Sequence, residues 1–289
     1  LVEVRLDLVG DDVRFSPSVG RYGNGKGVRD ALDKTVGAVM NVGHLMRRFQ
    51  PGPEGGYIRE LHADPEVNMM LSILSESLND TEEACRALQL DFEKYRYLWA
   101  TDLKDFFADF DAGASIETEL GQKLPDLKKY HEALAKYETV REDIVKIASP
   151  CDVAHVRVNV VPVKEALMGH VENWIDMFKD ALKDSLQSKL GTLLALMSTS
   201  EEGLKVTFED NDPDTTNKLN GVMKTLRTVH SEDEKTQEMF EPLKNTVALL
   251  KKHSVKVDEI LIAGKQVNDV LDDAPMSWKD LVGSSYRKK

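Results

Sequence analysis

The stretch from Leu88 to Phe110, LQLDFEKYRYLWATDLKDFFADF, decides which fold we expect for this sequence. Seven apolar residues recur in it at steps of four, three, four, four, three and four, which predicts a helix with one buried face. Aromatic residues dominate this stripe, and each large aromatic side chain buries roughly 150–250 Å². A cofactor-binding face is the alternative, but core packing is the commoner reason for such spacing. The stripe consists of Leu88, Phe92, Tyr95, Trp99, Leu103, Phe106 and Phe110.

The composition fits a large, soluble, helix-rich protein. A chain of 289 residues exceeds one ordinary domain, so we expect two or three packed subdomains. The 38 Lys and Arg residues are outnumbered by 50 Asp and Glu, for a net charge of −12. This balance argues against a nucleic-acid interface and against adhesion to anionic lipid, because both need a basic face. The longest apolar run, residues 190–197, is far shorter than the ~18 residues of a membrane span.

The ends and the cysteines indicate a piece of an intracellular protein. The chain opens at Leu1, without a methionine or a signal-peptide pattern, inside a strand-like alternation. We therefore expect it to be an excerpt from a longer polypeptide. Cys85 and Cys151 lie far apart and in no metal-ligand spacing, so a reducing compartment with two ordinary packing thiols is favoured.

We place the aromatic helix at residues 81–111, because the sequence has a break near residues 79–80 and a helix stop at Gly113. Other long helices are expected to pack beside it. The second very long helix, at residues 164–197, has Trp174 and Phe178 as anchors, and these are natural partners for the Trp99 stripe. Phe240 anchors a later helix. The other helices are expected at residues 28–49, 64–79, 115–149, 214–229, 231–250 and 255–272. We expect a bend at Pro125 within the third of these, an interruption at Gly203 after the long helix, and a capping box that begins at Ser231. Pro275 is expected to stop the last helix, and Ser277 to begin a new one.

Two segments alternate apolar and polar residues as half-buried strands do. They are residues 2–9, VEVRLDLV, and residues 153–163, VAHVRVNVVPV. A lone strand is not stable, so we expect the two segments to pair. Val4 and Val158 would then lie within one sheet. His155, on the polar side of its segment, is expected to be solvated.

Two stretches partly match ligand-binding motifs. Residues 20–27, GRYGNGKG, resemble the start of a phosphate loop, but Gly27 stands where Ser or Thr should hold magnesium. The acidic residues 209–214, EDNDPD, resemble a calcium loop, but Thr215 and Gly221 stand where glycine and a bidentate glutamate are needed. We interpret both stretches as surface loops.

No catalytic constellation is apparent. The seven histidines are scattered, and none has a His or Cys partner three or four residues away. The carboxylates alternate with lysines on the polar faces of helices, as solvated helices require. We therefore predict no catalytic residue, no cofactor and no metal in this chain. The predicted core anchors are Phe92, Tyr95, Trp99, Phe106, Phe110, Trp174, Phe178 and Phe240.

Four segments, in this order, resemble the tail of axonemal dynein heavy chains, and they span nearly the whole chain. The first is VEVRLDLV with the following VRFSPSV, and the second is DFEKYRYLW with FFADF. The third is AHVRVNVVPVKEAL with WIDMF. The fourth is GLKVTF with EMFEPLKNTVALLKKH and the region of Trp278. No single segment is a diagnostic motif, but their common order is specific, and the MFEPLKNT segment looks more like axonemal than cytoplasmic chains.

The resemblance implies a structural role in the tail, or stem, just before the linker of the motor, in an outer-arm chain. The family's ATP hydrolysis, with magnesium, takes place in AAA+ modules far downstream, so this segment itself is expected to be non-catalytic. The implied partners are other dynein heavy chains, intermediate and light chains, and docking proteins on doublet microtubules, with no nucleic acid, membrane or small-molecule substrate. The implied location is the cytoplasm and the axoneme of a cilium or flagellum, as part of the cytoskeleton.

The expected fold is mostly α, made of elongated consecutive helical bundles plus a small two-stranded β element. We expect a first bundle with an N-terminal strand at residues 1–150, a strand and long connecting helix at 151–203, and a second, truncated bundle at 204–289. A spectrin-like adaptor would contain similar helices, but it would repeat about every hundred residues and lack the strands. A nucleotide-binding protein using residues 20–27 is the alternative from the enzyme class.

Overall fold

The computed structural model describes residues 2–20, 25–49, 56–118, 120–206 and 215–288. Its contacts group into two compact units, which we describe separately. The first unit comprises residues 1–102 and 140–172, and the second comprises residues 103–139 and 173–289. The helix α7 (Val161–Lys205) contributes to both units, and the three-part division expected from the sequence stays a prediction.

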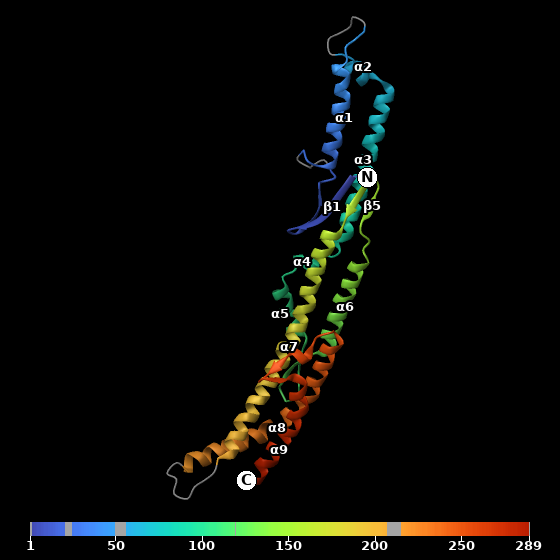
Figure 1. Cartoon of the computed structure of the whole chain (residues 1–289). Coiled ribbons are helices and arrows are strands. Elements are labelled where there is room, and N and C mark those ends of the chain that lie inside the picture. The colour runs from blue at the N-terminus through green and yellow to red at the C-terminus, as the bar shows by residue number, and fades with distance from the viewer. Residues whose placement is uncertain (1, 21–24, 50–55, 119, 207–214, 289) are drawn as a thin grey trace. The chain divides into compact units, whose positions relative to one another are not determined.

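The first unit combines a sheet with a helical hairpin (Figure 1). The sheet holds four strands in the order β2-β1-β6-β5. Besides the first part of α7 and the end of α6 (Leu127–Lys146), the described residues of this unit form six helices or strands before residue 102 and two strands after residue 150. They are β1 (Val2–Val9), β2 (Asp12–Ser16), α1 (Val28–Leu45), α2 (Ile58–Ala63), α3 (Pro65–Glu93), α4 (Tyr97–Ala100), β5 (Cys151–Val153) and β6 (Val156–Asn159).

The predicted strand pairing is confirmed. β1 pairs with β6 in parallel, with Val4 opposite Val158. Val156 and Val158 are buried while His155 is exposed, as the alternation predicted. Two further strands, β2 and β5, extend the pair on its outer sides, so the element is larger than the two-stranded one expected. β5 is so short that its apolar alternation is too brief to be recognised in the sequence.

Within the hairpin of the first unit, α3 starts at a recognisable signal. Asp64 caps α3, with its carboxylate accepting hydrogen bonds from the backbone N–H groups of Glu66 and Val67 at 2.8 and 3.2 Å. Pro65 occupies the first turn, where its missing N–H costs nothing. The start predicted at Asp64 is therefore confirmed, but the predicted end at residues 79–80 is wrong because α3 continues to Glu93.

The single aromatic helix predicted for residues 81–111 is also wrong. The chain forms the end of α3, the short α4 and then α5 (Leu103–Gly113). Between α3 and α4 the backbone tightens, because Tyr95 N–H and Arg96 N–H bond carbonyls only three residues back. Thr101 is extended, and Asp102 directly precedes α5, where aspartate is a favoured capping residue.

The second unit is built largely from helices and two short hairpins. Its elements, besides the remainder of α7, are α5, β3 (Ser115–Glu117), β4 (Lys123–Pro125), most of α6 (Leu127–Lys146), α8 (Thr215–Lys252), the short 3-10 helix η1 (Val257–Glu259), β7 (Leu261–Ile262), β8 (Lys265–Gln266) and α9 (Val267–Lys288).

The helix predicted at residues 115–149 is only partly present. Its first part is the β3–β4 hairpin, in which Ile116 lies opposite Leu124. Gly121 adopts a φ of +76°, which favours glycine, and Pro125 cannot donate within a helix. These two residues explain why α6 begins only at Leu127.

The helix predicted at residues 164–197 is confirmed and is longer than expected. Its predicted stripe is buried from Leu167 to Leu193. Gly203 does not interrupt the helix. It allows a close approach instead, because a Cβ atom there would lie 2.4 Å from Oγ1 of Thr225.

Three predicted boundaries in the last third are wrong, because buried stripes run through them. α8 continues past Ser231, whose hydroxyl donates to the carbonyl of Thr228 instead of capping a new helix. α9 continues past Pro275 and through the restart expected at Ser277. In contrast, the residues before Val267 form η1 and the β7–β8 hairpin in place of the helix expected at 255–272, with Ala263 and Gly264 both at positive φ.

Candidate functional site

The most developed side-chain cluster of the second unit is aromatic. We call it the aromatic cluster, and it draws on three helices. α5 contributes Phe106, Phe107 and Phe110 because these positions fall on one side of a helical turn. α6 contributes two residues that are seven positions apart, and α7 contributes two residues that are four positions apart. The full set is Phe106, Phe107, Phe110, Tyr130, Tyr137, Trp174 and Phe178.

Trp174 and Phe178 of α7 form the centre of the aromatic cluster. The ring of Trp174 stacks on Tyr137 with a centroid distance of 5.0 Å, and Phe106 meets it edge-on at 4.8 Å. The ring of Phe110 packs edge-on against Phe178, with a centroid distance of 4.9 Å. Both α7 residues are almost completely buried. Offset and edge-on pairs of this kind contribute about 0.5–1.5 kcal/mol each beyond the burial of their area.

One polar group belongs to the aromatic cluster. The Tyr130 hydroxyl donates a hydrogen bond to Oδ1 of Asp111 at 3.2 Å. Burial, together with the neighbouring Asp111 carboxylate, raises the pKa of the Tyr130 phenol. The phenol is therefore neutral at physiological pH, where it acts as a hydrogen-bond donor that fixes α5 against α6.

The other predicted anchors occupy different surroundings. Phe92 and Tyr95 are buried in the first unit, and Phe240 is buried in the second. Trp99 is only half-buried. Its indole N–H donates to the carbonyl of Asp11 at 3.2 Å, and its ring lies 6.5 Å from that of His170.

Sequence reasoning missed Trp278 as an anchor. Its side chain is 1% exposed, and its indole N–H donates to Oδ1 of Asp233 on α8 at 2.9 Å. The residue lies four positions after the buried Ala274 and three before the buried Leu281, which is helical spacing. That signal was available, but the stop assumed at Pro275 concealed it.

Two histidines that are 122 residues apart meet in the second unit. His131 Nδ1 lies 3.0 Å from His253 Nε2. His253, 4% exposed, is also 2.8 Å from Oε1 of Glu138 through Nδ1, while Nζ of Lys252 is 3.1 Å from His131 Nε2. With both rings neutral, every donor in this row of contacts meets an acceptor. Lys252 donates to His131, His131 donates to His253, and His253 donates to Glu138. We call these four residues the histidine chain.

The histidine chain is not a metal centre. Both ring nitrogens of His253 face protein partners, so none is left for a cation. Among the residues that the structure describes, no group of three or more His, Cys, Asp or Glu side chains is arranged to hold a metal ion. The acidic residues 209–214, interpreted as a surface loop, lie outside the described residues.

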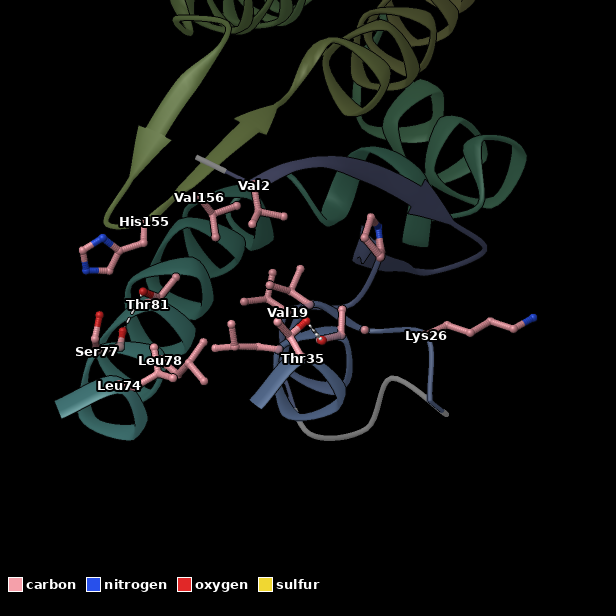
Figure 2. A pocket seen from close by; sticks show the side chains of 15 residues that line it. Val2, Val19, Lys26, Thr35, Leu74, Ser77, Leu78, Thr81, His155 and Val156 are labelled. Atoms are coloured by element: carbon pink, nitrogen blue, oxygen red, sulfur yellow. Dashed lines mark hydrogen bonds between the residues drawn. The ribbon is translucent and has the colours of Figure 1, made fainter. Parts of the chain in front are cut away.

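The glycine-rich stretch does not form a phosphate cradle in its described part. Residues 21–24 lie outside the described residues. The backbone N–H of Gly27, just before α1, donates to Oδ2 of Asp30 at 3.1 Å, so a carboxylate already occupies the helix start. Lys26 extends away from the neighbouring groove (Figure 2). This geometry favours the interpretation as a surface loop.

An apolar groove lies in the first unit between α1, α3 and the end of the sheet (Figure 2). Its cavity volume is about 550 Å³. Leu74 and Leu78 of α3 face Thr35 of α1 across it, and Val2 and Val156 close its end at the sheet. The few polar side chains around it do not form a catalytic set.

Comparison with known proteins gives a consistent result. No family model matches the chain. The chain is 27% identical to the dynein beta chain of the flagellar outer arm from Chlamydomonas reinhardtii, over 97% of its own length. It is 26% identical to dynein axonemal heavy chain 17 of Homo sapiens over 96% of its length, and 27% identical to the ciliary dynein beta chain of Heliocidaris crassispina over 97%.

The match covers this chain almost completely but only a small part of each relative. It spans 7% of the Chlamydomonas protein and 6% of each of the other two. All three relatives are named as axonemal, ciliary or flagellar dyneins, which places their family in the axoneme. None of the helices within the described ranges is long and apolar enough to cross a membrane. The chain is thus similar, over nearly its whole length, to one segment of axonemal dynein heavy chains.

Proposed function

We propose that this chain is a non-catalytic segment of a heavy-chain tail, located just before the linker of the motor. It would act as a helical scaffold that connects the ATP-driven motor to its associated chains and to the doublet microtubule. The observation that carries the proposal is the match to axonemal dynein heavy chains over 96–97% of the chain. An outer-arm chain is favoured, because a relative named for the inner arm matches over only 58%.

The chemistry of the described residues supports a structural role. Among the described residues, the histidine chain has its donors and acceptors matched internally. The ATP and magnesium of the proposed full-length motor would then belong to AAA+ modules elsewhere in the heavy chain. The proposed partners are other heavy chains, intermediate and light chains, and docking proteins on the doublet microtubule.

The two units contain contacts suited to carrying load. In the first unit, the parallel pairing of β1 with β6 joins segments about 150 residues apart, so pulling either segment shears several backbone hydrogen bonds together. In the second unit, the aromatic cluster ties α5, α6 and α7 through interlocked rings. A four-stranded sheet of this kind is not expected in a spectrin-like adaptor, which leaves that alternative without a specific observation in its favour.

The non-catalytic assignment is tested by titrating the 289-residue chain with Mg-ATP in a calorimeter. We expect no saturable heat up to about 1 mM nucleotide, because Asp30 occupies the N-terminus of α1 and Lys26 points away. The matched control is Lys26→Ala. Saturable micromolar binding that this substitution abolishes would overturn the assignment.

The scaffold role is tested in Chlamydomonas, in a strain whose outer-arm beta chain carries this chain in place of its matched segment. A second strain carries a deletion of the segment. We expect the replacement to support outer arms on the doublets and the deletion to remove them, while the ATPase rate of purified motor fragments stays unchanged in both. Normal outer arms in the deletion strain would refute the scaffold role.

A further inference from the structure

The ladder between β1 and β6 is the inner one of the sheet in the first unit. The order β2-β1-β6-β5 places a further strand on each of its sides, which shields its backbone hydrogen bonds from water. It consists of four residue pairs, from Val2 opposite Val156 to Arg5 opposite Asn159, and Figure 2 shows Val2 and Val156 at the same end of the two strands. Val158, in a pair between these ends, is fully buried.

The parallel direction of β1 and β6 decides how tension acts on their ladder. Tension that reaches β1 from its N-terminal side pulls on Val2, at one end of the ladder. Tension along α7 pulls on Asn159, the last residue of β6, at the other end. The two pulls are opposed and run along the strands, so they load all four residue pairs together, in shear.

The connection from β6 to α7 leaves little slack. A single residue, the buried Val160, lies between Asn159 and the start of α7. Oδ1 of Asn159 accepts a hydrogen bond from the backbone N–H of Val161 at 3.0 Å. Nζ of Lys164 donates to two backbone carbonyls near the end of α6, at 2.6 and 2.9 Å. The first turn of α7 is therefore fixed in place, and tension passes directly between the helix and the strand.

The ladder between β1 and β2 cannot take over this load. It is antiparallel, and the pair of Arg5 with Ser16 lies at its open end, opposite the turn at Gly10. Tension between Val2 and the chain after Ser16 pulls this open end apart, so the pairs break one after another toward the turn. Only the β1–β6 ladder is loaded in shear among the strand pairs that β1 forms in the described residues.

We propose that the β1–β6 ladder is a mechanical clamp, which carries tension from β1 straight into α7 and keeps residues 10–155 off the load path. The inference rests on the proposed scaffold role, in which tension crosses this chain. While the clamp holds, α1, α2 and α3 form a side branch that bears no tension. Its rupture brings residues 10–102 of the first unit into the load path, and their unfolding lengthens the chain by roughly 300 Å, at about 3.3–3.6 Å for each residue.

Single-molecule force spectroscopy of the 289-residue chain, with handles attached in two geometries, tests this proposal. In the shear geometry, one handle precedes residue 1, and the other is joined to an azide-bearing amino acid in place of the exposed Glu172 of α7. In the matched control, the first handle moves to the exposed Asp11, in the turn after β1. Both handles then pull beyond the same end of the β1–β6 ladder and open it pair by pair, over nearly the same length of chain.

We expect the shear geometry to rupture at a force at least about twofold higher than the control at the same loading rate, because four pairs must break together. No lengthening step should precede this rupture, and roughly 300 Å should be released after it. Circular dichroism of both handle-bearing chains, matched to that of the unlabelled chain, establishes that each is folded.

Two results would overturn the clamp. Equal rupture forces in the two geometries would mean that the β1–β6 ladder is not loaded in shear. Lengthening steps at lower force in the shear geometry would mean that α1, α2 and α3 lie in the load path. Neither result affects the outer-arm assembly test, which judges the scaffold role within the whole motor and without applied force.

Discussion

Replacing Trp174 by alanine should be among the most destabilising single substitutions in the second unit. The side chain is 1% exposed, with Tyr137 stacked on it at 5.0 Å and Phe106 edge-on at 4.8 Å. Truncation of a buried Trp to alanine costs about 3–5 kcal/mol, and the loss of two aromatic pairs places this case near the upper end. Trp99, which is half-buried, should lose only about half as much on the same change.

Urea unfolding followed by circular dichroism measures the difference between the two variants. With a slope of about 2–3 kcal/mol per molar urea, a loss of 4 kcal/mol lowers the unfolding midpoint of the second unit by roughly 1.5 M. Trp174→Phe is the control, because it retains an aromatic ring against Tyr137 and should recover most of the loss. If Trp99→Ala, in the first unit, costs as much free energy of unfolding as Trp174→Ala, the argument from the nearly complete burial of Trp174 is wrong.

Three further predictions concern local features. Asp64→Ala should cost about 1 kcal/mol by removing the two cap hydrogen bonds of α3, while Asp64→Asn should cost much less, as thermal unfolding can measure. Gly203→Ala should cost about 1–3 kcal/mol in urea unfolding through its clash with Thr225, and Thr225→Ala should relieve this cost in the double variant. Burial raises the pKa of the Cys85 thiol to about 11, so at pH 8 iodoacetamide should modify the half-buried Cys151 first, and Cys85 should react only as the pH approaches 11 or the chain unfolds. Equal labelling rates for the two cysteines at pH 8, measured by peptide mass spectrometry, would contradict the burial of Cys85.

The parts of the fold that the sequence predicted correctly share one property, an unbroken local pattern. Period-two alternation placed β1 and β6, and the need to pair a lone strand predicted their contact. Period-3.6 spacing over nine positions from Leu167 to Met197 placed α7. In each case several residues of the pattern, such as Val4, Leu6 and Val158, are buried on the same face, so an exception at a single position, such as Val2, does not change the conclusion.

The candidate sites were harder to predict because their residues come from distant parts of the chain. His131 and His253 are 122 residues apart, and nothing in either local sequence distinguishes a paired ring from a solvated one. Periodicity indicates which face of a helix is buried but not which element covers it. The groove between α1 and α3 was missed for the same reason, since its lining residues look like an ordinary core stripe until the missing cover is seen.

The boundaries in α8 and α9 were predicted wrongly because each stop signal was judged by its own free energy, without the free energy of burying the side chains beyond it. A capping box such as the one expected at Ser231 contributes about 1 kcal/mol, and an internal proline such as Pro275 costs about 3 kcal/mol. Each fully buried large apolar side chain contributes about 1.5–3 kcal/mol. The buried residues of α8 stay in phase across Ser231, because Val229 and Thr236 are seven residues, or about two helical turns, apart, so ending the helix there would put the later buried side chains out of phase. A stripe that stays in phase through a stop signal therefore predicts one continuous helix, whatever the signal would do on its own.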